Sequence, residues 1–442
     1  MKILLIWAFL MNSYSLFKTG DCASHNQILS VRASTQEQVD ILENITRHEE
    51  LYESVLLQPV SPWHIKAEAD VHLFVSANRS EAVMDLLQKH SISHQVLLNN
   101  TNELMELQTR RLPNTTRSSS SFYETYHSLE EIYEWIEDIV LGYPEMVETF
   151  SIGSSFENRS LQALKLSGEK KANKKAIWMD CGFHAREWIS PAFCLWFVQH
   201  CLTNYKQDQN ITHLLDNMDV YVLPVMNPDG YKYTWLRTFT NRNRMWRKNR
   251  SHRKGSLCTG VDLNRNFDAN WCTEGASNNT CSETYCGPAA HSEPETQALA
   301  EFLRNHIDSV QIYYTIHSYS QMLLFPYSYT LDKVPNHDEL MGLVKEVAEK
   351  INASSGSTYK YGPGAETIYL CPGGSDDWAY DLGIKYSFTF ELQDTGEYGF
   401  LLPPSRIPQA CREALIAVQT IALRVIEKTK PDSPDSKTLI DV

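Results

Sequence analysis

Short apolar runs alternate with helical patterns along most of the chain after Phe122. Alternation of apolar strands with amphipathic helices is typical of an α/β domain. Helices are predicted at residues 129–140 and from Ser190-Pro191 onwards, where the proline suits the first turn of a helix. The strand-like runs of this region are residues 176–179, 220–223, 312–316 and 386–390.

Polar side chains stand where three of these apolar runs end. His184 and Glu187 follow the first run, while His317 and Glu391 end the last two. Open α/β sheets bind ligands outside the carboxyl ends of their strands, so we expect these four side chains to meet at one edge. A histidine and a glutamate three positions apart can share one metal ion. Taken singly, that spacing and a histidine at a strand end are weak signals, because both also occur as ordinary structural polar residues.

Glu391 is the candidate that is hardest to explain as a structural residue. It follows an aromatic run that predicts a buried strand, and a buried carboxylate without a partner costs several kcal/mol. Beside a metal ion it would have both a partner and a task, since a carboxylate with a raised pKa can take up and return a proton. We therefore predict that Glu391 is a general base.

The region before residue 110 has a pattern of its own. Strands are predicted at residues 54–57, 71–75 and 95–98, with one helix at 80–89 capped by Ser80 and a second ending at Arg110. This predicts a small α+β domain without a cluster of catalytic residue types. Residues 110–121 combine arginines, a proline and a serine run, which is typical of an exposed stretch. It is either a plain linker or, at Arg117, a cut site for a trypsin-like protease.

The N-terminus and the cysteines both indicate export. Lys2 precedes an apolar run at residues 3–11 that is too short to span a bilayer, which predicts a secretory signal peptide with an undetermined end near residue 20. The net charge of −14 argues against a general nucleic-acid binder. Ten cysteines favour an extracellular protein with disulfides. No later segment is long and apolar enough to predict a membrane helix. Glycosylation sequons begin at Asn44, Asn78, Asn99, Asn114, Asn158, Asn210, Asn249, Asn278 and Asn352.

Two basic segments can bind anions. The arginines and lysines of residues 241–254 surround Trp246, and in isolation they are either a solvated basic patch or a polyanion site. Asn264 and Arg265 lie among the clustered cysteines. An arginine there can bind a carboxylate through two hydrogen bonds.

Five motifs occur in order: His184-Ala185-Arg186-Glu187, Trp246-Arg247-Lys248-Asn249-Arg250, Asp262-Leu263-Asn264-Arg265-Asn266-Phe267, Ile316-His317-Ser318-Tyr319-Ser320 and Phe390-Glu391-Leu392. Together they resemble the zinc metallocarboxypeptidases of the pancreatic A/B type, made as proenzymes, over residues 45–427. The resemblance implies a mixed eight-stranded twisted sheet with helices on both faces, after a small ferredoxin-like α+β propeptide. It implies a signal peptide at 1–20, a propeptide with linker at 21–117, a catalytic domain at 118–427 and a disordered tail at 428–442.

The resemblance also implies a role for each matching residue. His184, Glu187 and His317 match the ligands of one Zn2+, and Glu391 matches the general base and acid. Arg250 matches the residue that polarises the scissile carbonyl and stabilises its oxyanion. The residues matching substrate contacts are the carboxylate clamp Asn264 and Arg265, its lid Tyr369, and the secondary contacts Arg186, Arg247, Ser318 and Tyr319.

Asp376 matches the acid on the pocket floor of the B-type members, and Gly364 and Ser328 match small residues that keep the pocket open. This implies a secreted, monomeric exopeptidase that removes C-terminal Lys or Arg from peptides and proteins. The alternative is a catalytically silent relative that only binds peptide ends. The resemblance also implies activation by a trypsin-like serine protease, with cleavage between Arg117 and Ser118 favoured over cleavage at Arg110-Arg111.

The family's disulfides carry over as Cys181 with Cys194, Cys258 with Cys281, and Cys272 with Cys286. Three further cysteines then lack an evident partner: Cys201, Cys371 and Cys411. Gln393 stands where relatives usually carry arginine, which affects the charge balance near Glu391, and residues 236–241 look like an insertion. Asn249 carries a sequon inside the predicted site, so we expect it to remain without glycan.

Overall fold

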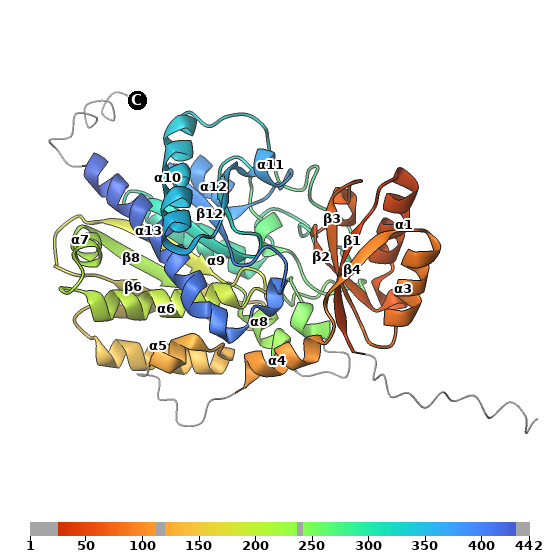
Figure 1. Cartoon of the computed structure of the whole chain (residues 1–442). Helices are drawn as coiled ribbons and strands as arrows, with labels where there is room; N and C mark the ends of the chain where they lie inside the picture. Colours follow the sequence, from red (N-terminus) through yellow and green to blue (C-terminus); the bar gives the residue numbers. More distant parts are fainter. Residues whose placement is uncertain (1–24, 111–119, 237–241, 430–442) are drawn as a thin grey trace, which may run out of the picture.

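The computed structural model describes residues 25–110, 120–236 and 242–429, which form two units packed side by side (Figure 1). The predicted signal peptide, the predicted cut between Arg117 and Ser118, residues 237–241 of the predicted insertion, and residues 430–442 of the predicted tail lie outside these ranges. Within the described part of the chain, no helix has the length and apolar character needed to cross a membrane.

The N-terminal unit is an antiparallel four-stranded sheet, in the order β2-β3-β1-β4, with helices packed on it. This confirms the predicted α+β class, although β1 and α1 were not predicted from the sequence. Ser80 does not cap α3, because it is already the first helical residue and its hydroxyl donates to Gln27. The elements are β1 Gln27–Arg32, α1 Gln36–Arg47, α2 Glu49–Tyr52, β2 Ser54–Gln58, η1 Pro62–His64, β3 Asp70–Val75, α3 Ser80–Lys89, β4 Ser93–Leu98 and α4 Thr101–Thr109.

The larger unit is built on a mixed eight-stranded sheet in the order β11-β10-β12-β9-β7-β8-β6-β5. The central strands β12, β9, β7 and β8 are parallel, whereas β10 and β6 run antiparallel to their central neighbours. The predicted sheet is confirmed. The strands are β5 Val147–Ser154, β6 Ser160–Leu166, β7 Lys175–Cys181, β8 Met218–Leu223, β9 Val310–Ser318, β10 Met322–Phe325, β11 Lys360–Pro363 and β12 Tyr386–Leu392.

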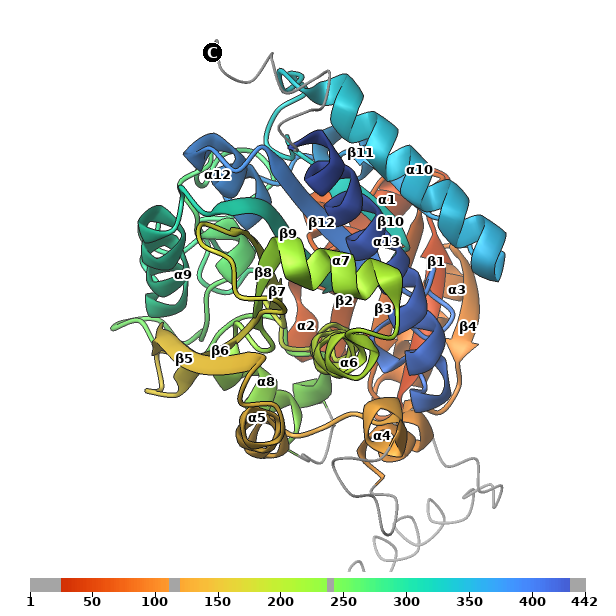
Figure 2. The same ribbon diagram turned by 90° about the vertical axis from the view of Figure 1, so that its left-hand side faces the viewer.

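Helices cover both faces of this sheet, as Figure 2 shows with α9 and α12 on one side and α6, α10 and α13 on the other. Side chains of β7 alternate between two apolar cores: Ile177 and Met179 join the α6 and α13 side, while Trp178 joins the α9 and α12 side. The helices are α5 Leu129–Gly142, α6 Ile189–Asn204, α7 Gln209–Asn217, α8 Pro228–Thr234, α9 Pro294–Asn305, α10 His337–Ser355, α11 Gly364–Thr367, α12 Ser375–Leu382 and α13 Ile407–Lys428.

Candidate active site

Three neighbouring parallel strands bring the predicted site residues to one edge of the sheet. Glu391 of β12 stands directly opposite His317 of β9 in the strand register. On the other side of β9, β7 ends at Cys181 and is followed by Gly182, whose φ of 66° permits the turn that leads to His184. The predicted convergence at the carboxyl ends of the strands is confirmed.

The three predicted metal ligands form a buried cluster. The Nδ1 atoms of His184 and His317 are 3.1 Å apart. The carboxylate of Glu187 spans both, with Oε1 at 2.7 Å from His184 and Oε2 at 3.0 Å from His317. One ligand atom from each residue lies within 4.8 Å of the others. Two imidazole nitrogens and a carboxylate oxygen converging on one point are a donor set that suits zinc.

Neighbouring side chains orient both imidazoles. The outer Nε2 of His184 lies 3.1 Å from Asp262 Oδ1, and the outer Nε2 of His317 lies 3.0 Å from Thr315 Oγ1. With Nε2 protonated to make these hydrogen bonds, Nδ1 keeps its lone pair for a metal. No role was predicted for Asp262 or Thr315. A signal was nevertheless present, since Asp262 opens the quoted motif around Arg265.

Burial raises the pKa of Glu391 to about 8, because the charged form loses solvation. The nearby carboxylate of Glu187 acts in the same direction, while His317 favours the charged form and opposes both. A carboxyl group with such a pKa can exchange a proton near neutral pH. This property suits a general base that later acts as an acid.

One cavity brings nearly all the predicted catalytic and substrate residues together. It is lined by the metal cluster and Glu391, and by residues of the predicted carboxylate clamp and specificity pocket. The predicted site residues that line it are Arg186, Asn264, Arg265, Ser318, Tyr319, Tyr369 and Asp376.

Arg250 is the exception, and it corrects the sequence analysis. Its guanidinium lies over the rings of Tyr233 and Trp246, at 3.8 and 4.4 Å from their centroids, and Arg250 is not among the residues that line the cavity. Arg247, three positions earlier, does line it. Its Nε and NH2 groups donate to Asp262 Oδ2 at 3.0 and 2.9 Å, and NH1 lies 3.8 Å from Glu187. The structure therefore favours Arg247 over Arg250 for contact with a reacting carbonyl.

The predicted carboxylate clamp is held by the disulfide-bonded loop. Asn264 Oδ1 accepts a hydrogen bond from the Ser375 backbone at 2.9 Å. Arg265 is 4% exposed, and its Nε has no hydrogen-bond partner. Its NH1 donates to the Asn264 carbonyl at 2.8 Å and its NH2 to the Cys371 sulfur at 3.5 Å. In the described part of the chain none of these hydrogen-bond partners is a carboxylate, so a buried cation faces the cavity without a direct ion pair, although the charges of Asp262 and Asp376 act favourably on it.

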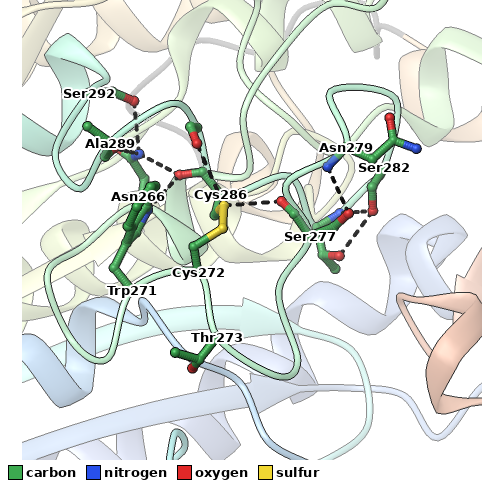
Figure 3. Close-up of a disulfide and its surroundings, with 12 residues drawn as sticks. Asn266, Trp271, Cys272, Thr273, Ser277, Asn279, Ser282, Cys286, Ala289 and Ser292 are labelled. Carbon is green, nitrogen blue, oxygen red and sulfur yellow. Dashed lines mark hydrogen bonds between the residues drawn. A yellow bond between two sulfur atoms is a disulfide. The ribbon is translucent and has the colours of Figure 1, made fainter.

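All three predicted disulfides are confirmed: Cys181–Cys194, Cys258–Cys281 and Cys272–Cys286. Figure 3 shows the last of these beside Asn266 and Trp271, which both donate to the Cys286 carbonyl, at 2.8 and 2.9 Å. These contacts fix the loop that follows the clamp. Because the loop has little regular secondary structure, covalent links replace the sheet hydrogen bonds that hold the opposite wall of the cavity.

A buried carboxylate occupies another part of the cavity. Asp376 is 3% exposed, and its Oδ2 accepts from Thr389 Oγ1 at 2.7 Å. Gly364 packs against Ser328, which lines the cavity, so closely that a Cβ at position 364 would lie 2.0 Å from the Ser328 hydroxyl. The adjacent Asp377 points elsewhere and accepts from the backbone of Ser328 and Tyr329.

Comparisons with known proteins agree with this geometry. A zinc carboxypeptidase family matches residues 132–417, and a carboxypeptidase activation peptide family matches residues 29–108. Carboxypeptidase B2 of Rattus norvegicus is 49% identical over 414 residues, covering 93% of this chain and 96% of that protein. Carboxypeptidase B of Bos taurus is 45% identical over 415 residues, with the same two coverages.

The chain belongs to the zinc carboxypeptidase family. The crystal structure of thrombin activatable fibrinolysis inhibitor (TAFI) superposes with a TM-score of 0.87 at 49% identity, covering 91% of this chain and 98% of that one. The protein is a zinc metallocarboxypeptidase of the B type that carries an activation peptide. The cluster of His184, Glu187 and His317 fits its zinc ion.

The activation peptide lies against the active-site cavity of the carboxypeptidase unit. Leu57, Gln58 and Val60 form part of the cavity lining. His64 stacks on Tyr369 with ring centroids 4.0 Å apart, and His72 Nδ1 lies 2.8 Å from the hydroxyl of Tyr319. The contact therefore covers the predicted substrate residues and leaves the three metal ligands assembled.

A second contact, which extends from the rim of the cavity, holds the two units together. Gln108 of α4 donates to the Leu402 carbonyl at 3.0 Å and accepts from Arg244 Nε at 3.1 Å. Apolar side chains from both units, including Phe74 and Phe400, share one buried cluster. No local pattern in the sequence marked these interface residues, because each contact joins distant parts of the chain.

The departure at Gln393 and the sequon at Asn249 can both be located in the structure. Gln393 donates to Glu413 Oε2 at 2.7 Å, and Glu413 also accepts from Tyr359 at 3.0 Å. Gln393 thus contributes a neutral donor to a buried carboxylate beyond the end of β12. Asn249 is fully buried and donates to Glu293 Oε2 at 2.8 Å, so its amide nitrogen is inaccessible to the glycosylation machinery in the folded chain.

Proposed function

We propose that this carboxypeptidase removes C-terminal Lys or Arg from peptides and proteins once its activation peptide has been released. The observation that carries the proposal is the pairing of opposite charges in one cavity. Arg265 offers a buried cation for the substrate's terminal carboxylate, and Asp376 offers a buried anion for a basic side chain. Burying a charge without a direct ion pair costs free energy, which a substrate carrying both charges would offset.

In the proposed reaction, Asn264 and Arg265 hold the terminal carboxylate, and Tyr369 closes over it. Because an internal peptide bond offers no carboxylate at that point, the enzyme acts as an exopeptidase. Arg247 donates to the oxygen of the scissile carbonyl as negative charge develops there. Arg186, Ser318 and Tyr319 make secondary contacts with the substrate.

Proton transfer is assigned to Glu391. Its carboxylate takes a proton from the attacking water and delivers it to the nitrogen of the leaving amino acid. The zinc ion, when bound by His184, Glu187 and His317, supplies a Lewis acid that lowers the pKa of water and polarises a carbonyl oxygen. A silent, peptide-binding relative is disfavoured, since ligands, base, carbonyl donor and clamp are all present in one chain.

We further propose that the protein is a secreted monomer kept latent by its activation peptide, and that a trypsin-like serine protease cuts between Arg117 and Ser118. The domain boundaries then fall as predicted, with residues 21–117 released from the enzyme that begins at Ser118. One of the similar proteins is named as a fibrinolysis inhibitor. By that likeness, we propose that the enzyme restrains fibrinolysis by trimming C-terminal lysines from proteins.

Limited trypsin treatment should convert a latent protein into a hydrolase for peptides that end in Arg. A metal chelator should abolish this activity, and added zinc should restore it. Arg117→Gln should remain latent after brief treatment, whereas the matched double variant Arg110→Gln with Arg111→Gln should activate normally. N-terminal sequencing of the active product should begin at Ser118. Full activity of the uncut chain on large substrates would contradict this assignment.

Replacing the pocket carboxylate should change the specificity of the enzyme. Removing one partner of a buried charge pair costs about 3–5 kcal/mol, so Asp376→Ile should lower kcat/KM for Lys and Arg ends at least about a hundredfold. Apolar C-terminal residues should become better substrates. Asp377→Asn serves as the neighbouring control, because the Asp377 carboxylate accepts from the backbone amides of Ser328 and Tyr329 and is not among the residues that line the cavity. An Asp376→Ile enzyme that still prefers Arg would show that the pocket lies elsewhere.

Docking of the activation peptide should weaken as pH falls. The pKa of His64 is lowered to about 4 in the docked state, chiefly by burial and then by the charges of Arg265 and Lys66. A histidine in the released peptide titrates near pH 6.5. Above that pH His64 is neutral in both the docked and the released state, and docking has its full strength. As pH falls from about 6.5 towards 4, protonation favours the released state, so docking weakens. After cleavage, size-exclusion chromatography at pH 7.5 and 5 should reveal more free activation peptide at the lower pH. In His64→Gln this difference should shrink; an unchanged difference would assign the effect to other groups.

A further inference from the structure

A free thiol lies in the wall of the active-site cavity. Three cysteines in the described part of the chain are outside the disulfides: Cys201, Cys371 and Cys411. Cys201 on α6 and Cys411 on α13 are fully buried in the apolar core. Cys371 is only half-buried and lines the cavity beside the carboxylate clamp. Of these three cysteines, Cys371 is therefore the one that a small molecule in the cavity can reach.

The neighbour of this thiol is a buried cation whose hydrogen-bond partners in the described part of the chain include no carboxylate. Arg265 points its NH2 group at the Cys371 sulfur, 3.5 Å away, and its buried Nε has no hydrogen-bond partner. A guanidinium in such a position binds carboxylates through charge-assisted hydrogen bonds. The Arg265 charge also favours the thiolate, which is the nucleophilic form of cysteine. A carboxylate-bearing molecule held by Arg265 thus has its other end within reach of a nucleophile.

The backbone fixes the two groups relative to each other. Cys371 N donates to the Ser328 carbonyl at 2.7 Å, and Gly373 N donates to the Ala269 carbonyl at 2.8 Å. Gly373 packs so closely on the chain at Arg265 that a Cβ there would lie 2.3 Å from the Arg265 carbonyl oxygen. The thiol is consequently part of a rigid wall, and its distance from the guanidinium does not depend on a free loop.

We propose that Cys371 is a modification site for small thiol-reactive compounds that carry a carboxylate, with Arg265 as the recognition group. The proposal rests on the assignment of Arg265 as a carboxylate clamp. With iodoacetate as the example, the thiol loses its proton to solvent, and the thiolate attacks the methylene carbon. A sulfur–carbon bond forms, the carbon–iodine bond breaks, and iodide leaves. The resulting carboxymethyl group lies against Arg265 and blocks the terminal carboxylate of a peptide substrate.

The activation peptide should protect this site. Val60 shares the cavity lining with Cys371, and His64 stacks on Tyr369, two residues away along the chain. Burial in this state raises the pKa of the Cys371 thiol to about 11, although Arg265 acts in the opposite direction. The uncut protein should therefore react slowly, and release of the activation peptide should expose the thiol together with the clamp.

Alkylation by iodoacetate and its neutral isostere iodoacetamide tests the proposal on zinc-loaded, activated protein. A thiolate without a nearby cation reacts faster with the neutral reagent, because the anion is repelled. At Cys371 we expect the reverse order, with iodoacetate faster by about tenfold or more. Peptide mapping by mass spectrometry should find one added group, on Cys371, with Cys201 and Cys411 unmodified. The uncut chain should take up the label more slowly.

Two variants separate recognition from reactivity. Arg265→Gln should lose the preference for iodoacetate while keeping a reactive Cys371, as scored by mass spectrometry rather than by hydrolysis. Cys371→Ala should retain its own untreated activity after iodoacetate, whereas the unsubstituted enzyme should lose activity in step with labelling. Faster reaction with iodoacetamide, labelling of Cys201, Cys411 or Glu391 in place of Cys371, or equal inactivation of Cys371→Ala would overturn the proposal. Because labelling is read independently of catalysis, failure of the proposed peptidase activity would leave this result interpretable.

Discussion

Glu391→Gln should retain zinc and lose about a thousandfold or more in kcat. Glutamine keeps nearly the same shape and can still form a hydrogen bond, but it cannot take a proton from water or return it to the leaving nitrogen. General acid–base catalysis is typically worth about 10² to 10⁴ in rate, and Glu391 serves both proton transfers. Steady-state kinetics on a peptide ending in Arg measure the loss, and metal analysis of the same sample measures zinc content.

His317→Ala is the matched control on the neighbouring strand, because its Nδ1 faces the other two ligands. This variant should lose zinc and activity together. The contrast separates a residue that moves protons from one that holds the metal. Near-normal turnover of Glu391→Gln, with zinc bound, would rule out the proposed role of Glu391.

Arg247→Ala should lower kcat/KM by about a hundredfold to a thousandfold, which is the typical effect of removing one donor to a developing oxyanion. Arg247 also donates to Asp262, which in turn contacts His184. Metal analysis is therefore needed to show that zinc remains bound. Arg247→Lys should recover part of the activity, because a positive charge returns without the planar fork that binds Asp262.

Arg250→Ala is the matched control three residues away. Its guanidinium lies on the rings of Tyr233 and Trp246, so we expect a decrease in Tm with kcat/KM changed only a few-fold. If instead Arg250→Ala were inactive and Arg247→Ala nearly normal, the assignment based on the cavity lining would be reversed.

The sheet edge could be predicted from the sequence because each residue there stands at the end of an apolar run or shortly after it. His184, His317 and Glu391 are fixed by three runs whose length and pattern define both the strand and its end. Parallel neighbours then bring strand ends together without any knowledge of loops. The disulfide pairs came from family resemblance, since spacing alone leaves many pairings of the cysteines open.

Arg247 and Arg250 could not be distinguished in the same way. They are three residues apart in a segment without a helix or strand after η3 Arg242–Met245, so no periodicity tells which side chain faces the cavity. The alternative interpretation of the basic run as a solvated patch is wrong for Arg247. This side chain is buried and donates hydrogen bonds to Asp262. Which arginine faces the cavity depends on charged partners outside this segment, such as Asp262 for Arg247. A local sequence pattern holds no information about such partners.

The position of the metal cluster on β7 and β9 has a consequence for how the protein is made. His184 and His317 are 133 residues apart, and they meet only when β7 and β9 have paired in the central sheet. Contacts between such distant residues are costly to form in chain entropy and arise slowly. Zinc therefore cannot act as an early nucleus for folding, and its uptake by all three ligands requires that β7 and β9 have paired. Metal retention in a newly synthesised sample thus reports the fraction of molecules in which this long-range pairing has formed.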